Sequence, residues 1–387
     1  MNHDGYDDLI IAAQSDRNMG TAKIYIMFGQ NISGDIALRT SADVILERDY
    51  VCIGAMAVGD LNGDGIDDLA ISDILTNSGA NPPVQSGHSP SGGVYILFGK
   101  TGGWTSPVNL QTQSNVTFVR NNGASVLQIA SLAIGDINND GKADLVMAAP
   151  EESNPTYSLS NAGRVYAVFG GSAFPASGNK EIDTEADVTI YGAEKDDKIG
   201  GSLEVTHYND KSLAVGDVDG DGIGDILIGA PLSMVGKTNS TGIGKVEILY
   251  GRSNWGSVPI DLYNDYDIRL KLSATAQKIG INTGYAVAVE DVNGDGQGDI
   301  AVSSPHAPTP NYNGYMHVIY GGSGLKKDYQ IDLESDLLIT TASPPDWYGN
   351  RRMGESFVIG NFNNTGKPDI ILGAPKGAGF SGETSAG

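Results

Sequence analysis

The sequence predicts an all-β protein, a β-propeller of four-stranded antiparallel blades. Three observations predict this fold. Glycine accounts for 53 of 387 residues, short apolar segments recur between turn sequences, and an acidic loop motif returns at intervals of 76, 81, 74 and 70 residues. Repeats of this length with four strand-like segments are typical of propeller blades. We therefore expect residues 1–387 to form a single propeller of about five to six blades.

The repeated loop follows the pattern DxNxDGxxD. It reads DLNGDGIDD from Asp60, DINNDGKAD from Asp136, DVDGDGIGD from Asp217 and DVNGDGQGD from Asp291, with a weaker copy, NFNNTGKPD, from Asn361. The opening residues fit the same frame if Asn2 occupies position 3 of the loop. Five regular copies of one unit favour a propeller over a sandwich of hairpins.

The segments around each loop also repeat. A short apolar strand precedes the loop, and a second strand follows it, as in DLVMAAP from Asp144. After a variable connection, a third strand ends in glycine, at Gly29, Gly99, Gly170, Gly251 and Gly321. A fourth, more polar strand is expected at residues 187–192 and 267–272. Because the third strands are apolar at nearly every position, we expect them to be buried on both faces between neighbouring blades.

The loop chemistry favours calcium. Calcium takes six to eight hard oxygen ligands at about 2.3–2.6 Å, and Asp or Asn at alternate positions of a tight loop can converge on one ion. An EF-hand would need Glu at position 12 and flanking helices, whereas position 12 here lies inside an apolar strand. The predicted ligands of four good sites, including the position 7 carbonyls, are Asp60, Asn62, Asp64, Ile66, Asp68, Asp136, Asn138, Asp140, Lys142, Asp144, Asp217, Asp219, Asp221, Ile223, Asp225, Asp291, Asn293, Asp295, Gln297 and Asp299.

Two further loops are expected to be weak or empty. The first lacks its leading residue and offers Asn2, Asp4 and Asp8. The last begins at Asn361 and keeps only Asp369 as a carboxylate.

These features together resemble the FG-GAP repeat of integrin α-subunit propellers and related bacterial-type surface proteins. The second strand ends in Ala-Pro at Pro150, Pro231 and Pro375, although Asp73 stands at this turn in the first full unit. The resemblance covers essentially the whole chain. It implies a seven-bladed ring in the full protein, with calcium loops on one face and ligand-binding loops on the other. Since too few residues are present to close such a ring, we expect a part of a longer chain, incomplete at both ends.

Composition narrows the classes of binding partner that the chain could have. The formal net charge of −23 disfavours nucleic acid and anionic membrane surfaces. Cys52 is the only cysteine, so no internal disulfide can form. No run of 18 apolar residues is present, so we expect no direct membrane insertion. We expect an extracellular or cell-surface location, with the signal sequence outside these residues.

No catalytic set emerges from the sequence. The five histidines form no HExxH motif, and GxSxG is absent. We therefore expect a non-enzymatic scaffold for adhesion or for recognition of a protein or carbohydrate ligand. An alternative is an accessory propeller of a secreted enzyme, such as a phospholipase D-like hydrolase, whose catalytic domain lies outside this chain. A structural spacer is a third option.

The ligand face is expected opposite the calcium loops. Its connections carry aromatic and arginine side chains, which often anchor partners. The candidate ligand-binding residues are Tyr157, Tyr312, Trp347, Tyr348, Arg351 and Arg352.

Overall fold

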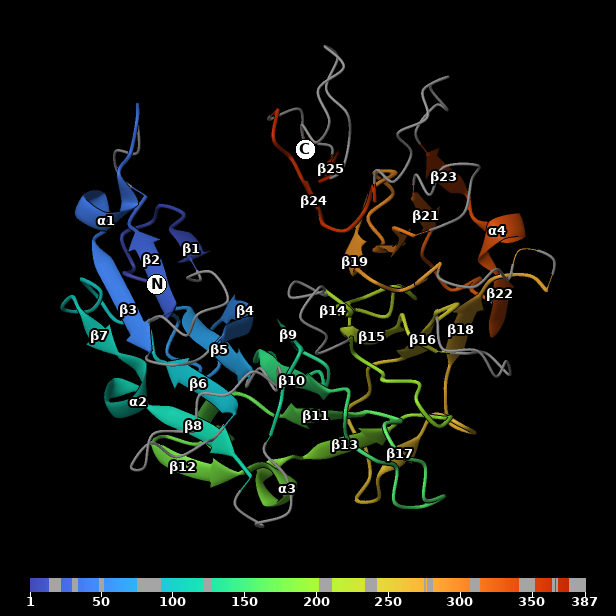
Figure 1. Ribbon diagram of the computed structural model, residues 1–387, viewed down its shortest axis with the longest axis horizontal. Coiled ribbons are helices and arrows are strands. Elements are labelled where there is room, and N and C mark those ends of the chain that lie inside the picture. The colour runs from blue at the N-terminus through green and yellow to red at the C-terminus, as the bar shows by residue number, and fades with distance from the viewer. Residues whose placement is uncertain are drawn as a thin grey trace, which may run out of the picture.

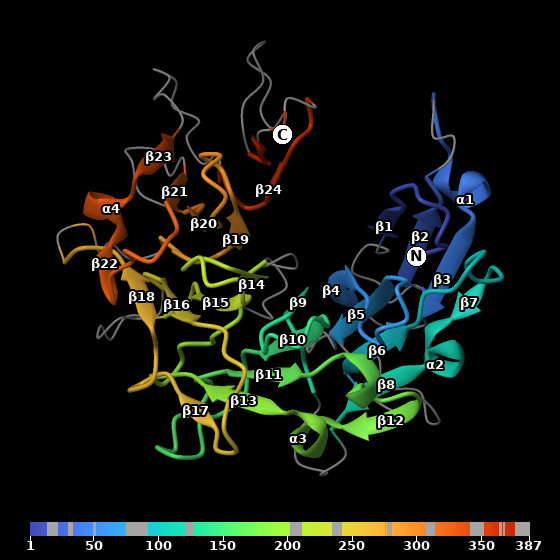
Figure 2. The ribbon, with the colours of Figure 1, turned by 180° about the vertical axis from the view of Figure 1, so that it is seen from behind.

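The computed structural model describes residues 1–13, 22–29, 34–48, 52–74, 92–120, 127–201, 211–233, 242–274, 276, 281–306, 314–340, 352–363, 366 and 368–375. Their strands form six sheets that follow one another along an arc in chain order (Figure 1). The first strands of the second to sixth sheets lie next to one another in succession, and the view from behind shows the same order of sheets (Figure 2). The predicted all-β propeller is confirmed.

Each of the four middle sheets contains four antiparallel strands of one repeat, as predicted. These strands are β4 (Cys52–Gly59), β5 (Asp68–Ile74), β6 (Gly93–Leu97) and β8 (Val116–Val119); β9 (Ser131–Gly135), β10 (Asp144–Ala149), β11 (Arg164–Val168) and β13 (Val188–Tyr191); β14 (Leu213–Gly216), β15 (Asp225–Ala230), β16 (Lys245–Leu249) and β18 (Ile268–Lys271); β19 (Val287–Glu290), β20 (Asp299–Ser304), β21 (Tyr315–Ile319) and β23 (Leu337–Thr340). The outer sheets hold β1 (Leu9–Ala13), β2 (Ala22–Met27) and β3 (Val44–Arg48) at one end, and β24 (Phe357–Gly360) and β25 (Asp369–Leu372) at the other.

Four short strands that the sequence did not predict link neighbouring repeats. They are β7 (Val108–Asn109), β12 (Gly178–Glu181), β17 (Ile260–Asp261) and β22 (Asp328–Gln330). Each comes from the connection between strands 3 and 4 of one repeat and pairs in parallel with the last strand of the preceding sheet. One-turn helices occur in the same connections, at α1 (Leu38–Ser41), α2 (Leu110–Gln113), α3 (Ile182–Glu185) and α4 (Ile331–Glu334). Backbone hydrogen bonds therefore join the blades at their outer edges.

Glycines at the end of the first strand allow close packing at the inner edges. A Cβ atom added to Gly59 would lie 2.5 Å from Cγ2 of Ile134 in the next blade. The same contact joins Gly135 to Val215 and Gly216 to Val289. A β-branched side chain of each blade thus fills the space left by the glycine before it.

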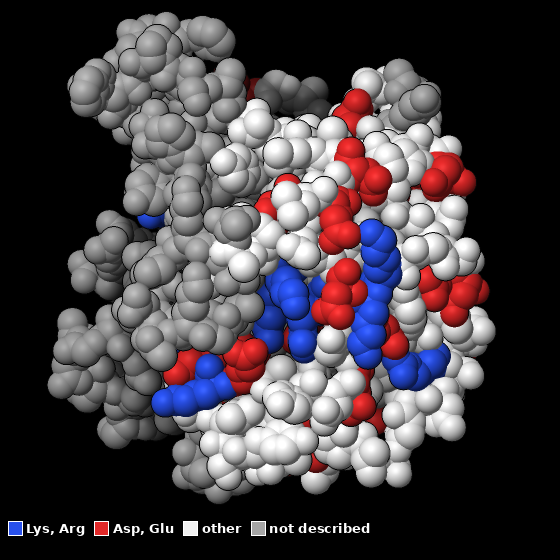
Figure 3. Space-filling model, turned by 90° about the vertical axis from the view of Figure 1, so that its right-hand side faces the viewer, with Lys and Arg blue, Asp and Glu red and all other residues white. Residues whose placement is uncertain are grey.

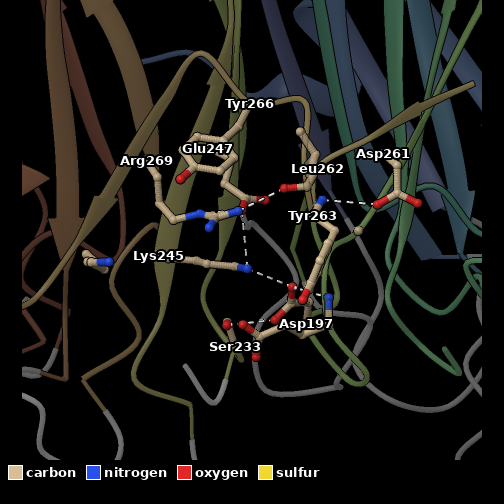
Figure 4. A network of polar contacts seen from close by, with 12 residues as sticks. Asp197, Ser233, Lys245, Glu247, Asp261, Leu262, Tyr263, Tyr266 and Arg269 are labelled. Atoms are coloured by element: carbon tan, nitrogen blue, oxygen red, sulfur yellow. Dashed lines mark hydrogen bonds and ion pairs between the residues drawn. The ribbon is translucent and has the colours of Figure 1, made fainter. Parts of the chain in front are cut away.

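The third strands are buried as predicted, and one of them also carries buried charges. Lys245 and Glu247 of β16 are almost fully buried. The Lys245 ammonium lies 2.8 Å from Oδ2 of Asp197 and 3.3 Å from Oε1 of Glu247. Arg269 donates to the same Glu247 oxygen at 2.8 Å, and Ser233 donates to Asp197 at 2.7 Å (Figure 4). This buried network joins β16 and β18 to the connections that precede β14 and follow β15.

Charged side chains on the outer edge are also paired. Figure 3 views the side on which β18, β22 and α4 lie, and Lys and Arg alternate there with Asp and Glu. Ion pairs within or next to these elements in the sequence include Lys271–Asp328 at 3.9 Å, Lys326–Glu334 at 2.9 Å and Arg252–Asp267 at 2.7 Å, where Asp267 directly precedes β18. Within the described residues, no helix has the length and apolar character needed to cross a membrane.

Candidate metal centre

The acidic loop that joins strands 1 and 2 has one backbone path in four blades. In the first, Oδ1 of Asp60 accepts from the main-chain N–H of Asp64 at 3.0 Å, and Oδ2 accepts from Gly65 at 2.8 Å. Corresponding bonds from positions 5 and 6 reach Asp136, Asp217 and Asp291. Gly65 has φ +85°, which a side chain would disfavour. Position 1 therefore organises the turn around its carboxylate.

Position 9 ties the loop to the third strand. Asp144 is fully buried, and its Oδ2 accepts from the N–H of Ile137 at position 2, at 2.9 Å. Its Oδ1 accepts from the N–H of Gly170, at the end of β11, at 2.8 Å. The same two bonds hold the equally buried carboxylates of Asp68, Asp225 and Asp299. The position 9 carboxylate is thus the buried anchor of each hairpin.

The third-strand glycine is required by this close approach. A Cβ atom at Gly170 would lie 2.0 Å from the carbonyl oxygen of Ala143, which precedes Asp144. Clashes of 2.0–2.5 Å with the equivalent carbonyl recur at Gly29, Gly99, Gly251 and Gly321. Since any side chain would push the strand away from the loop, the glycine is part of the loop's structure.

A second hydrogen bond connects three of these loops to the next blade. The N–H of Gly171, one residue beyond the strand-ending glycine, donates to the carbonyl of Leu61 in the preceding loop at 2.8 Å. The equivalent bonds join Arg252 to Ile137 at 3.0 Å and Gly322 to Val218 at 2.7 Å. Consecutive acidic loops are therefore linked through two adjacent main-chain amides.

Burial disfavours the ionised form of the position 9 carboxylates. It raises the pKa of Asp68 to about 6 and that of Asp144 and Asp225 to about 7, although main-chain donors oppose the shift. The pKa of Asp299 is raised for the same reason. A cation bound in the loop would favour the ionised form of these groups. A cation bound in the loop would therefore offset the cost of burying these carboxylates.

The loop from Asp217 also has the spacing of a calcium site. Carboxylate oxygens of Asp217, Asp219 and Asp225 all lie within 4.8 Å of one another. Two oxygens on one Ca²⁺ can be no more than about 5 Å apart, twice the usual ligand distance. Asp221, also a predicted ligand, is outside this group, and its Oδ1 accepts from the N–H of Ile223 at 2.8 Å. The hard-oxygen set therefore fits calcium.

The other three full loops differ at position 3. Asn62, Asn138 and Asn293 stand where the Asp217 loop has a carboxylate. Each amide oxygen accepts from the main-chain N–H at position 5, and Oδ1 of each position 5 Asp accepts from position 7. These loops keep the same path with one carboxylate fewer. Their calcium ligands stay a prediction.

The first and last loops keep the path with poorer ligands. His3 (φ +61°) and Gly5 (φ +85°) have the left-handed conformation found at positions 4 and 6, and Gly29 donates to Oδ1 of Asp8 at 3.2 Å. This agrees with Asn2 at position 3. In the last loop, Oδ2 of Asp369 still accepts from the N–H of Phe362 at 3.0 Å. The hairpin form therefore does not depend on a full set of carboxylates.

One repeated contact was missed by the sequence interpretation. Oδ2 of Asp187, the residue before β13, accepts from the N–H of Phe169, which precedes the third-strand glycine, at 2.7 Å. The same position holds Asp43, Asn115, Asp267 and Asp336, each accepting from the residue before Gly29, Gly99, Gly251 or Gly321. A polar residue in front of each fourth strand is the signal that could have revealed it.

The predicted ligand face is described only in part. Tyr157 lies in the connection between β10 and β11, with 48% of its surface exposed. Arg352 has φ +49° and donates to Glu355 at 2.7 Å. Tyr312, Trp347, Tyr348 and Arg351 lie outside the described residues.

Comparison with known proteins agrees with this architecture. The model of the FG-GAP repeat matches residues 129–168, 211–246 and 283–319. Each match contains strands 1 and 2 of a blade with the acidic loop between them and reaches into strand 3, which the first and third matches contain in full. The chain therefore contains FG-GAP repeats at three places.

Curated proteins similar to this chain include phospholipases and integrin α-subunits. Human phosphatidylinositol-glycan-specific phospholipase D is 28% identical over 57% of this chain and 24% of its own length. Integrin alpha-PS2 of Drosophila melanogaster is 27% identical over 73% of this chain and 18% of its own. A solved structure, described as that of the Dos1 propeller, covers 87% of this chain and 59% of that chain, with a TM-score of 0.40 and 12% identity. The chain spans about a quarter or less of the length of these curated relatives.

Proposed function

We propose that this chain, with its FG-GAP repeats, is a calcium-stabilised, non-catalytic recognition scaffold that acts outside the cell or at its surface. The observation that carries the proposal is the buried carboxylate at position 9, repeated in four blades at the contact between the acidic loop and the third strand. Calcium would supply the positive charge that these carboxylates lack. Oxygens at positions 1, 3, 5 and 9, with the position 7 carbonyl, would hold it.

The expected gain in stability is large for a chain without a disulfide. If one site binds with a Kd of about 0.1 mM and calcium is near 1 mM, mass action stabilises the folded state by about 1.4 kcal/mol per site. Four such sites would contribute about 5–6 kcal/mol, comparable to the net stability of a whole domain.

Recognition is the use that suits such a scaffold. The acidic loops are occupied with holding hairpins, and the connections between strands 2 and 3 and between successive blades lie at the opposite ends of the strands. Variable connections on a rigid framework are a common place for binding residues. Integrin α-subunits among the relatives support a surface role. The partner we propose is an extracellular protein or a carbohydrate.

Thermal unfolding in calcium and in chelator tests the proposal. We expect the melting temperature to fall by several degrees or more when 1 mM CaCl₂ is replaced by EGTA, with 1 mM MgCl₂ restoring little of it. Magnesium is the matched control because it demands a smaller, more regular octahedral site. A difference below about two degrees between calcium and EGTA would contradict calcium stabilisation.

The second candidate is an accessory propeller of a secreted hydrolase. The observation in its favour is the match to phosphatidylinositol-glycan-specific phospholipase D from several animals. In this case the catalytic domain would lie outside these residues, and the chain alone would not cleave a glycosylphosphatidylinositol anchor. Sequencing the flanking gene distinguishes the two. A hydrolase domain with a cluster of zinc-ligating His and Asp favours the enzyme, and stalk-like repeats or a wall anchor favour adhesion.

A further inference from the structure

Two exposed tyrosines from different repeats pack against each other beside β17. Tyr157 comes from the connection between β10 and β11, and Tyr263 follows β17. Their ring centroids lie 5.8 Å apart at an interplanar angle of 52°, yet 48% of Tyr157 and 61% of Tyr263 is exposed. Asn264 approaches the Tyr157 hydroxyl with its amide nitrogen 3.4 Å away. A large aromatic surface is thus presented to solvent at the junction of two blades.

A buried pair of polar side chains holds both tyrosines in place. Asn154 is fully buried, and its amide nitrogen donates to Oδ2 of Asp261 at 3.0 Å and to the carbonyl of Gly192 at 2.9 Å. Asp261 in turn accepts from the N–H of Tyr263 at 3.0 Å. The side-chain oxygen of Asn154 accepts from the N–H of Thr156, one residue before Tyr157. One buried contact therefore fixes the backbone of both segments.

Residues 154–159, which include Tyr157, form a hydrogen-bonded turn. The main chains of Asn154 and Leu159 exchange two hydrogen bonds, at 2.9 and 3.0 Å. The four residues between them form a short projecting turn with Tyr157 near its tip. A turn held in this way loses little conformational freedom when a ligand binds, which favours affinity.

The chemistry around the rings selects the ligand class. The exposed neighbours are Thr156, Ser158, Asn264 and Asp265, and neither residues 154–159 nor residues 261–265 contain Lys or Arg. An anionic ligand would therefore meet no cation within these segments. Hydroxyl and amide groups can both donate to and accept from sugar hydroxyls, and a carboxylate accepts from them. The face of a tyrosine ring carries partial negative charge and attracts the C–H groups on the apolar face of a sugar.

The size of the platform also favours a sugar. A stable protein partner needs about 800 Å² of contact on each side, far more than two tyrosine rings offer. One or two sugar units are large enough to cover both rings.

We propose that Tyr157 and Tyr263 form a binding platform for a neutral glycan. The inference rests on the proposed recognition role, which it narrows to one ligand class and one place. The platform does not require calcium in any particular acidic loop, provided that the blades are folded.

Glycan-array binding by the full chain in 1 mM CaCl₂ tests the platform, with neutral, sialylated and sulfated oligosaccharides printed together. We expect binding to neutral members, followed by titration calorimetry with the tightest of them. Tyr263→Ala and Tyr157→Ala should each weaken affinity at least tenfold, and Tyr263→Phe, which keeps the ring, should stay within about threefold. Leu333→Ala, at a residue of α4 that is 69% exposed, is the control and should bind like the unmodified chain. Both tyrosine variants should melt at the same temperature as the unmodified chain, since the side chains that they truncate are exposed.

Three results would overturn the platform: no neutral glycan bound, binding confined to charged glycans, or unchanged affinity in both alanine variants. Calcium-dependent melting together with any of these would leave the scaffold proposal standing and remove only the platform. Tyrosine-dependent glycan binding without any calcium effect on melting would leave the platform standing and contradict calcium stabilisation of the scaffold.

Discussion

The main-chain N–H of Gly170 donates to Oδ1 of Asp144 at 2.8 Å, so the end of β11 is fastened to the buried carboxylate of the acidic loop. The bond is possible only because Gly170 has no side chain. Its missing Cβ atom would lie 2.0 Å from the carbonyl oxygen of Ala143. The loop and the third strand therefore depend on each other for their positions.

Gly170→Ala should consequently destabilise the protein by about 1–3 kcal/mol, the usual range for overpacking that displaces the backbone. Urea unfolding monitored by circular dichroism measures the effect. Gly324→Ala is the matched control, because a Cβ atom there meets no atom within 4 Å and its φ lies outside the left-handed region. Equal stability of the two variants would show that the loop and strand can separate at little cost.

The second prediction ranks the acidic loops by ligand at position 3. Asp219→Ala should lower the number of calcium ions bound per chain by one, because Asp219 belongs to the close carboxylate group with Asp217 and Asp225. Asn363→Ala, at the same position of the poorest full-length loop, should leave the number unchanged. Titration calorimetry gives both values. The same number of ions lost in the two variants would refute the ranking.

The repeat and its strands could be predicted from the sequence because each repeat contains its own signals. Asp136, Gly141 and Asp144 mark a loop by spacing alone, and the run that ends at Gly170 marks a buried strand. What could not be predicted depends on contacts between repeats. The parallel strand β17 is two residues long and has no pattern of its own, since the preceding blade supplies its partner β13.

The same distinction between local signals and distant contacts applies to the candidate site. The acidic residues were visible in the sequence, but the double role of Asp144 was not, because its partners Ile137 and Gly170 lie 7 and 26 residues away. Tyr157 was chosen as an aromatic residue in a long connection. Tyr263 was not chosen, because the contacts that bring the two tyrosines together join residues far apart in the sequence, as in the Asn154–Asp261 hydrogen bond between residues 107 apart.

His317 provides a prediction about pH. It lies in β21, its Nδ1 is 3.2 Å from the hydroxyl of Ser335, and its Nε2 is buried without a hydrogen-bond partner in the described residues. Burial lowers the pKa of His317 to about 4, although Asp332 acts in the opposite direction. In the unfolded chain the pKa is about 6.5. As pH falls below 6.5, the unfolded chain binds a proton that the folded chain binds only near pH 4, so stability is lost in this window.

At pH 5 the loss attributable to His317 is about 2 kcal/mol relative to pH 7.5. His317→Gln should remove this part of the pH dependence, while the carboxylates of the acidic loops titrate alike in both proteins. Urea unfolding at pH 7.5 and pH 5, at one fixed calcium concentration, gives the comparison. An equal fall in stability for both proteins would exclude His317 as the titrating group.

The last prediction concerns the buried ion pairs of the fourth blade (Figure 4). Lys245 lies between Asp197 and Glu247, and all three side chains are nearly inaccessible to water. Among the residues that the structure describes, Lys245→Met removes the only cation within 4 Å of Asp197, whereas Glu247 keeps Arg269. A buried carboxylate without a compensating cation typically costs about 3–5 kcal/mol.

We therefore expect Lys245→Met to lower the urea midpoint strongly, and the double variant Lys245→Met with Asp197→Asn to recover part of the loss, because the uncompensated charge is then gone. Lys326→Met breaks an exposed pair with Glu334 and should leave the midpoint nearly unchanged, since water screens such pairs. A double variant as unstable as the sum of its two single variants would show that packing of the lysine stem, rather than its charge, stabilises this junction between blades.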